Sequence, residues 1–600
     1  MSTPDSAASE NAANQALGAS MPSAGSARLA ELPAPLRAVI ATVCKRARLW
    51  THERADVEAE LAAHFHDGLA QGTAPDKLIA DFGDPKAAAK LIRRGKIRNR
   101  PWWWQTWHRF SQAVACLLAF VLACAVFHTY RFYSGTPTIT LRPIDELNRE
   151  AIALPESDRA WPIYRAAYLS LNHTREQHAT LAALRVATPP NPDASAALDR
   201  IAAPLSQIRA ASAKPGLGYL TSVSPDREIS AKNFELFQTH AQEGGHAIQP
   251  DAQNPEAFAL TLSHLGTMRE CVRLLRADAI AAMHRADAEH THANLAAMIS
   301  ISQQLRTPDT LISSLVSCAT TALAADTTRE LLTFRPSLLS DAQLTDLAHR
   351  FAALGGPREF VSVRGERVYF RDAIQRLYTD DGHGNGHLTS AGAAYFDKLA
   401  ALGSDTGSVG MLLTSVVSVD RKELTRAFER LLDRAEAAID VPLWQKDVET
   451  ADRVLDEYTA TPLARVRYLP LAVLAPALDR VRYTAQEIAT RRDSTLAVIA
   501  IELQRRATGQ FPESLAQLVP ARLPVVPRDL ADGTPLRYRR SGDSYVLYSL
   551  GADGQDDHGA RPVNDTDAFR VARFQRRDAT SKPCDLVYFP AVAPEPSPQP

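Results

Sequence analysis

Five aspartates near the end of the chain have the residue type and the spacing of a calcium-binding loop. They stand in one short stretch with several glycines and are Asp553, Asp556, Asp557, Asp565 and Asp567. Calcium takes about six to eight oxygen ligands in a flexible geometry, and carboxylates are its usual side-chain ligands. Two interpretations stay open for this stretch: a calcium site, or an ordinary acidic loop in contact with water.

A second, glycine-rich stretch has part of the spacing of an EF-hand calcium loop. If Asp381 takes the first ligand position, Asn385 takes the fifth, and both can offer side-chain oxygens. The twelfth position holds Gly392, where a bidentate glutamate is expected. A glycine-rich structural loop and a transition-metal site at His383 and His387 are the other interpretations of this stretch.

A third group of candidate ligands lies in one predicted helix and contains a single Glu-x-x-His pair, Glu289 with His292. A di-metal helical bundle needs two such pairs and further glutamates, and the sequence offers no second pair. These side chains, with His290 beside them, are therefore expected to form a solvated helix face. The sequence also has no HExxH, GxSxG or GxxxxGK[ST] motif, so no catalytic or cofactor-binding residue is predicted.

The overall charge of the 600-residue chain argues against nucleic acid as a partner. Lysine and arginine number 67 against 68 acidic residues, for a net charge of -1. Binding to nucleic acid normally needs a strongly basic domain or patch. The six cysteines do not form a disulfide framework. One bridge stays open, with Cys271, Cys318 and Cys584 as the candidates.

Residues 110–130 contain no charged residue. At ~1.5 Å per residue, a helix of this length is roughly 30 Å long, which matches the hydrocarbon core of a bilayer. Tryptophans cluster before this apolar run, and Tyr130 and Tyr133 lie at its end, as aromatic residues do at the two membrane interfaces. We therefore predict a single transmembrane helix at 108–132.

Basic residues are concentrated before the apolar run. They are Lys90, Arg93, Arg94, Lys96, Arg98, Arg100 and Arg109. Only Arg131 follows the run closely. Because lysine and arginine are retained on the cytoplasmic side, we expect a cytoplasmic N-terminus and a C-terminal bulk outside the inner membrane of a bacterium. The bilayer is the first predicted partner, and it also accounts for the basic run.

Periodicity and composition divide the rest of the chain. We predict disorder at 1–34, a cytoplasmic helical prefix at 35–98, a helical ectodomain at 140–490, an α+β module at 494–590 and a disordered tail at 591–600. The clearest helical patterns cover Phe258–Ile301, Thr310–Leu332 and Arg421–Ile439. The predicted fold class is therefore mainly α, with one transmembrane helix, a small N-terminal bundle, a large helical ectodomain and a small C-terminal α+β module.

The prefix carries a resemblance to a known group of domains. The matching positions are Leu49, Trp50, Glu58, Leu61, His64, Gly72, Phe82, Gly83, Asp84, Pro85 and Ala88. In these the prefix resembles the HAAS and permease-prefix helical domains of bacterial membrane proteins. That resemblance implies membrane-linked signalling or regulation without catalysis.

The C-terminal region carries a second resemblance. Its matching positions are Gly509, Phe511, Pro512, Leu515, Leu518, Pro527, Asp529, Gly533, Tyr538, Tyr545, Ser549, Gly551, Asp553 and Gly554. The region resembles the C-terminal domain of the type II secretion major pseudopilin, which implies a helix packed on a small antiparallel sheet and calcium in the final loop. The chain lacks that family's processed leader and N-terminal apolar helix, so pseudopilus assembly is not expected.

The whole arrangement resembles the membrane-anchored proteins of planctomycete-type bacteria. We therefore expect a cell-envelope binding or scaffold protein whose partners are the bilayer and other envelope proteins. Two alternatives remain: a transmembrane regulator that senses through its ectodomain and relays through the prefix, and an envelope enzyme whose active site does not show in sequence.

Overall fold

A computed structural model describes residues 24–237, 255–400, 408–445, 448–475, 478–551, 554–559 and 585–591. Helices predominate, and the described strands form one small antiparallel sheet, which confirms the mainly α fold class. The chain divides into two compact units, residues 1–126 and 127–600.

Short helices build the first unit. They are α2 (Ala24–Glu31), α3 (Ala34–Ala47), α4 (Thr51–Ala70), α5 (Pro75–Phe82) and α6 (Pro85–Arg98). In sequence, the pair Asp84-Pro85 predicts the start of a helix. The structure confirms this, because the Asp84 carboxylate accepts hydrogen bonds from the backbone amides of Lys86 and Ala87 at the start of α6. Apolar residues three or four positions apart meet in one core, which includes Leu36 and Phe65.

Helix α2 corrects the prediction of disorder over residues 1–34. The segment is poor in large apolar groups, which favours disorder, yet Leu29 and Leu32 lie near its end. Leu32 is only 2% exposed, and Leu29 packs against the same core. Their burial against neighbouring helices makes a helix favourable from Ala24 onward. Residues 1–23 lie outside the described part of the chain.

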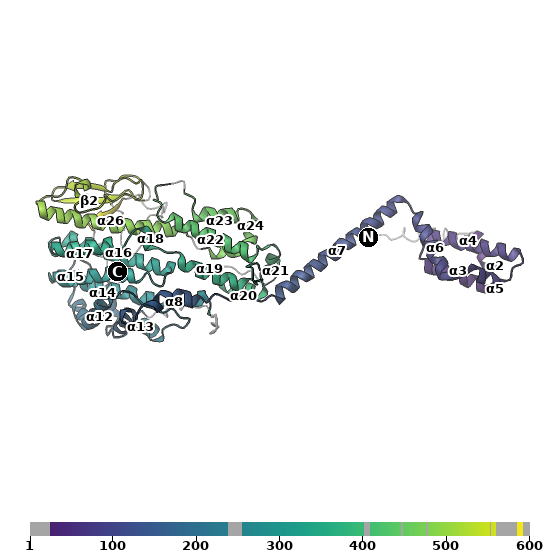
Figure 1. Ribbon diagram of the computed structural model, residues 1–600, viewed down its shortest axis with the longest axis horizontal. Coiled ribbons are helices and arrows are strands. Elements are labelled where there is room, and N and C mark those ends of the chain that lie inside the picture. The colour runs from purple at the N-terminus through teal and green to yellow at the C-terminus, as the bar shows by residue number, and fades with distance from the viewer. Residues whose placement is uncertain are drawn as a thin grey trace, which may run out of the picture. The chain divides into compact units, whose positions relative to one another are not determined.

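Helix α7 (Trp102–Ser134) contains the predicted transmembrane segment. It is 33 residues long and extends beyond the predicted 108–132 at both ends, because the aromatic residues on each side continue the helix. Among the described residues it is the one helix long and apolar enough to cross a membrane, with a mean hydropathy of 2.3 in its most apolar window. Figure 1 shows it as a single long helix.

The second unit begins with α8 and several shorter helices. They are α8 (Pro143–Ala153), α9 (Trp161–Leu169), α10 (Arg175–Ala182), α11 (Pro192–Arg200), α12 (Ala202–Ser212) and α13 (Arg227–Phe237), with 3₁₀ turns η1 (Glu156–Asp158) and η2 (Ala257–Ala259). Three long helices follow at the centre: α14 (Ser263–His284), α15 (Ala288–Gln304) and α16 (Leu311–Phe334). They are buried on almost every side, as central helices of a large core are.

Further helices complete the unit. They are α17 (Asp341–Ala352), α18 (Pro357–Phe360), α19 (Arg364–Leu377), α20 (Ser390–Ala400), α21 (Ser408–Val417), α22 (Arg421–Ala438), α23 (Ala451–Thr459), α24 (Pro462–Arg467), α25 (Leu469–Leu474) and α26 (Asp479–Thr508), with the 3₁₀ turn η3 (Leu515–Leu518). The first of the three predicted helical stretches corresponds to α14 and α15, the second to α16 and the third to α22. The first stretch is divided in two, because Asp287 starts a new helix by accepting a hydrogen bond from the His290 amide.

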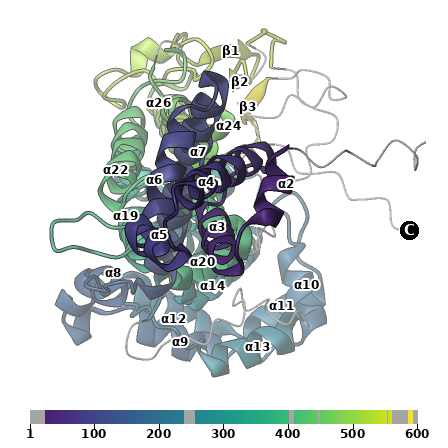
Figure 2. The ribbon, with the colours of Figure 1, turned by 90° about the vertical axis from the view of Figure 1, so that its right-hand side faces the viewer.

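The sheet lies against α26 at one edge of the second unit, and α9, α12 and α13 lie at the opposite edge (Figure 2). Its strands, in the order β1 (Arg537–Ser541), β2 (Ser544–Ser549) and β3 (Leu586–Phe589), are antiparallel. The first two strands were predicted from their β-type residues, at 536–538 and 545–550, with the turn between them at Gly542, whose φ is +58°. The third was not. The predicted border at 490–494 falls inside α26, so the helical body and the sheet share that helix.

Candidate functional site

The acidic loop after β2 is the strongest candidate site. Of the five predicted calcium ligands, Asp556 and Asp557 are described, and Asp553, Asp565 and Asp567 lie outside the described residues. The Asp556 carboxylate accepts hydrogen bonds from the Tyr548 hydroxyl (3.0 Å) and the His558 amide (2.9 Å). One Asp556 oxygen is therefore already held by the protein.

Asp585 joins this loop, although sequence analysis did not select it. Its Oδ2 accepts a hydrogen bond of 2.7 Å from the Gly559 amide, and the residue is only 2% exposed. Burial raises the pKa of Asp585, and the nearby charges of Asp556 and Asp557 raise it further. Asp585 directly precedes β3, and the four apolar or aromatic residues of that strand are too few to predict a strand from sequence alone.

Two carboxylate oxygens in this loop are buried and accept no hydrogen bond: Oδ2 of Asp557 and Oδ1 of Asp585. A buried carboxylate oxygen without a partner is costly, so such atoms usually face water or a cation. Within the described ranges, however, no group of three or more His, Cys, Asp or Glu side chains could hold a metal ion. The described loop thus offers unsatisfied oxygens of the type calcium prefers, but not a complete ligand set.

Asp529 fixes the geometry beneath this loop. It is fully buried, and its carboxylate accepts hydrogen bonds from the Ser549 hydroxyl (2.7 Å), the Leu550 amide (2.9 Å) and the Ala531 amide (2.9 Å). Arg537 of β1 pairs with it at 2.7 Å. Asp529 therefore joins both strands of the hairpin to the preceding turn, and its oxygens are committed to the protein.

The second predicted calcium loop is closed by hydrogen bonds within the protein. Asp381 Oδ1 accepts from the amides of His383 (2.8 Å) and Asn385 (3.1 Å), and Asp381 Oδ2 accepts from the Asn385 side-chain amide (2.9 Å). A Cβ on Gly386 would lie 1.8 Å from the Thr379 carbonyl oxygen, so the glycine permits a close backbone approach. This bonding favours the structural-loop interpretation over calcium at Asp381 and Asn385.

The ring of His387 is held by the protein on both sides. His387 Nε2 lies 2.9 Å from the carbonyl oxygen of Arg131, and its Nδ1 lies 3.0 Å from the Thr379 hydroxyl. Both ring nitrogens therefore have protein partners. Burial lowers the pKa of His387, which favours the neutral ring.

The histidines of α15 correct the prediction of a solvated face in part, because Glu289 is exposed but both histidines have carboxylate partners. His290 Nε2 lies 2.8 Å from Asp278, and His292 Nε2 lies 2.9 Å from Asp346. Asp278 is only 5% exposed and also accepts a hydrogen bond from Arg209. The prediction failed because the partner carboxylates come from α14 and α17, at sequence distances that helix periodicity does not report.

A buried His–His–Glu chain was also missed. His173 Nε2 lies 3.1 Å from His178 Nδ1, and His178 Nε2 lies 3.3 Å from Glu270 Oε1. Burial first, and His178 second, lower the pKa of His173 to about 4. The two nitrogens of His178 face different partners, so these polar contacts join α10 to α14 and do not converge on a metal site among the described residues.

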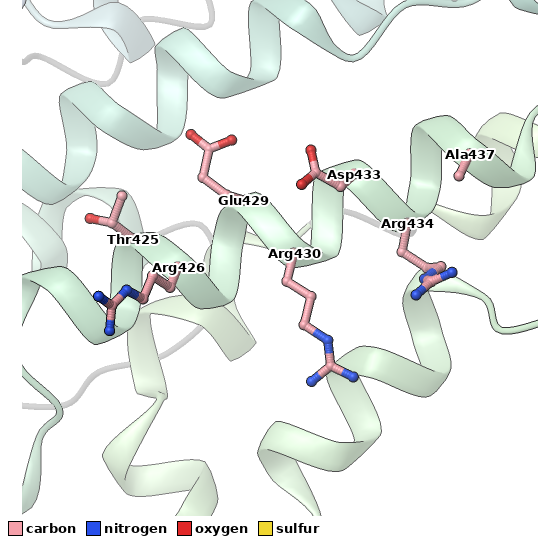
Figure 3. A pocket seen from close by; sticks show the side chains of 7 residues that line it. All are labelled: Thr425, Arg426, Glu429, Arg430, Asp433, Arg434 and Ala437. Carbon is pink, nitrogen blue, oxygen red and sulfur yellow. The ribbon is translucent and has the colours of Figure 1, made fainter.

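A hollow of about 530 Å³ lies along α22. Its lining comes from a single helix: Thr425, Arg426, Glu429, Arg430, Asp433, Arg434 and Ala437. Figure 3 shows Glu429 and Asp433 pointing to one side of the helix and Arg430 and Arg434 to the other. Arg367 pairs with both acids, and Glu449 pairs with both arginines. The hollow is an ion-paired surface and brings no nucleophile next to a base.

The cysteines show no disulfide in the described part of the chain. Cys271 in α14 and Cys318 in α16 are free and fully buried, and Cys584 lies outside the described residues. Burial raises the pKa of Cys318 to about 12. A thiol with such a pKa is not a nucleophile at neutral pH.

Comparisons of the chain with known protein families, with characterised proteins and with solved structures give no match.

Proposed function

We propose that this chain is a single-pass, membrane-anchored binding or scaffold protein of the bacterial cell envelope. Helix α7 carries the proposal, because a 33-residue helix with an unburied apolar stretch links two compact units. Apolar surface of that extent is stable in a bilayer and costly in water. The excess of basic residues before the span supports a cytoplasmic first unit and a second unit outside the inner membrane.

The surface of the larger, second unit supports the binding role. Its described surface offers long helical faces and the ion-paired hollow of α22, as interaction surfaces do, and the buried cysteines are unsuited to nucleophilic chemistry. Other envelope proteins are therefore the proposed partners besides lipid.

Reporter fusions to the full chain test this arrangement. Alkaline phosphatase fused after Pro600 should be active, and the same enzyme fused before Met1 should be inactive. Full-length protein extracted in mild detergent should elute in a complex of fixed stoichiometry with another envelope protein. Inverted fusion activities would refute the orientation. A chain that elutes alone, or that turns over hydrolase substrates, would refute the scaffold role.

The contacts of Arg100 favour a second candidate function, a transmembrane regulator that relays through the first unit. In the first unit the Arg100 guanidinium lies between the rings of Trp50 and Trp104, 4.1 and 4.3 Å from their centroids. Glu53 of α4 holds the same guanidinium through two hydrogen bonds. The bundle is thus joined firmly to the first turn of α7. Unchanged transcription and partner binding after deletion of residues 35–96 would contradict a relay role.

Calcium at the C-terminal loop is a separate proposal. Asp557 and Asp585 would hold the ion through their unpartnered oxygens, and Asp553, Asp565 and Asp567 stay predicted ligands. A cation that binds only the native state raises stability by mass action, by about 2.7 kcal/mol at a hundredfold excess over Kd. Calcium should therefore raise the unfolding temperature of the full-length protein.

A matched pair of variants makes the calcium test specific. Asp557→Asn should abolish the calcium-dependent rise, whereas Asp543→Asn, which changes an exposed acid in the β1–β2 turn, should preserve it. An equal response in both variants, or no response in the parent protein, would show that this loop is an ordinary acidic loop.

A further inference from the structure

The end of α7 is built into the core of the second unit. Phe132 is only 2% exposed and belongs to the unit's main apolar core. One turn earlier, His128 Nε2 lies 2.9 Å from the hydroxyl of Ser415 in α21, and the Arg131 carbonyl is bonded to His387. Figure 1 shows α7 joining the unit beside α20 and α21.

These contacts set the level of α21 relative to the apolar run. His128 lies within residues 110–130, about 3 Å along the helix axis before Tyr130, at ~1.5 Å per residue. Tyr130 and Tyr133 are 70% and 60% exposed, as aromatic residues at the headgroup level of a membrane are. Ser415 is bonded at the same level, so α21 lies where the hydrocarbon core meets the headgroups.

Helix α21 has a surface suited to that position. It contains no charged residue, and Leu413 and Val416, three positions apart, lie on one face. They are 67% and 61% exposed, whereas Met411 is buried against the unit. Exposed apolar side chains that continue the surface of a membrane span are stable in lipid and costly in water.

Helix α24, which packs on α21, has the same character. Leu463 is 60% exposed, and Arg465 and Arg467 are exposed on the same short helix. Apolar side chains flanked by arginines are typical of helices that lie in the membrane interface, since the arginines meet anionic headgroups.

We propose that α21 and α24 form a lipid-docking face that seats the second unit on the membrane surface from which α7 emerges. The proposal rests on α7 being the membrane span. Its occupant is the bilayer, because the face is continuous with the apolar surface of α7. A unit seated in this way is held in one orientation instead of moving freely on a tether.

Lipid-quenching fluorescence on the full-length protein in vesicles tests the proposal. Leu413→Cys and Val416→Cys are each labelled with the environment-sensitive dye NBD, in a chain with Cys116, Cys124 and Cys584 replaced by alanine. Lipids that carry a doxyl quencher near the headgroup should strongly reduce the emission at both positions.

Two further labels make every outcome decisive. Val525→Cys is a matched control, because Val525 is an equally exposed apolar residue at the sheet end of the same unit, and its label should not be quenched. Cys124, restored alone, reports on the span itself. Quenching at Cys124 without quenching at 413 and 416 refutes the docking face alone. No quenching at Cys124 by lipids that carry the doxyl group deep in the acyl chain refutes the span, because Cys124 lies about 9 Å along the helix from Tyr130. A blue-shifted but unquenched label at 413 indicates contact with protein and also refutes the proposal.

Discussion

Replacing Arg100 should loosen the first unit at the start of α7. The side chains of Arg100 and Glu53 are each only 7% exposed, and their two hydrogen bonds are 2.8 and 2.7 Å long. That bonding is the main cause of the lowered pKa of Glu53. Removing one partner of such a buried pair costs about 3–5 kcal/mol, and each ring contact contributes about 0.5–1 kcal/mol. These contributions overlap, so Arg100→Ala should cost about 3 kcal/mol.

Hydrogen exchange of the full-length protein in detergent measures this cost locally. A loss of about 3 kcal/mol raises the opening equilibrium roughly a hundredfold, so the amides at the start of α4 should exchange about that much faster. Arg100→Lys keeps the charge but not the planar two-bonded contact, and it should cost about half as much. Arg94→Ala, at an exposed arginine of α6, is the control and should change nothing. If Arg100→Ala raises the exchange rate of these amides by less than about threefold, the pair of Arg100 and Glu53 behaves as an exposed ion pair, which contributes less than about 1 kcal/mol.

Three further predictions concern the second unit. The pKa of His173, lowered to about 4 from 6.5, means that the unfolded chain binds the proton first, so stability should fall by up to about 3 kcal/mol as the pH falls from 6.5 to 4. Urea unfolding of His173→Gln should show a smaller pH dependence than the parent protein, and the exposed His349→Gln should keep the full dependence. Part of the dependence should remain in His173→Gln, because burial lowers the pKa of His264 to about 3. Gly386→Ala should accelerate proteolysis of the loop at 379–387, because the new Cβ would overlap the Thr379 carbonyl oxygen. Cleavage of the variant and of the parent protein at the same rate would contradict this packing. Asp529→Ala leaves several buried donors unpaired and should cost about 3 kcal/mol in urea unfolding; a cost below about 1 kcal/mol would mean that the hairpin relaxes around the gap.

Features that depend on neighbouring residues were predictable from sequence. Helix α6 begins where Asp84 and Pro85 predict it, and the β1–β2 turn lies at Gly542, because caps and tight turns are decided by a few adjacent residues. The apolar run of α7 is equally local. Its continuation to Ser134 was not predictable, since the last turn is stabilised by burying Phe132 in a core formed by distant helices.

The third strand and the acidic loop show why the rest was not predictable. Strand β3 has four residues, and its pairing partner β2 lies far earlier in the chain. A strand that short has too little alternation to be recognised without its partner. Asp585 was missed for the same reason, because its role depends on β3 returning next to Asp557. The five predicted aspartates were chosen by proximity in sequence, whereas a site is assembled by proximity in space.

The charged residues at the middle of α26 led to a predicted domain border at 490–494, although the structure has one continuous helix there. Arg491 of α26 pairs with Asp326 of α16 at 3.4 Å, and Arg329 of α16 donates to the Ser494 hydroxyl at 3.0 Å. A charge-rich stretch resembles an exposed linker in sequence, but Arg491 and Arg329 are only 8% and 6% exposed and have polar partners. Separating the sheet from the body at 490–494 would break the contacts of Arg491 with Asp326 and of Arg329 with Ser494. The resemblance to a pseudopilin domain therefore concerns a module that is joined to the helical body through α26, and calcium bound in its loop would stabilise the body as well.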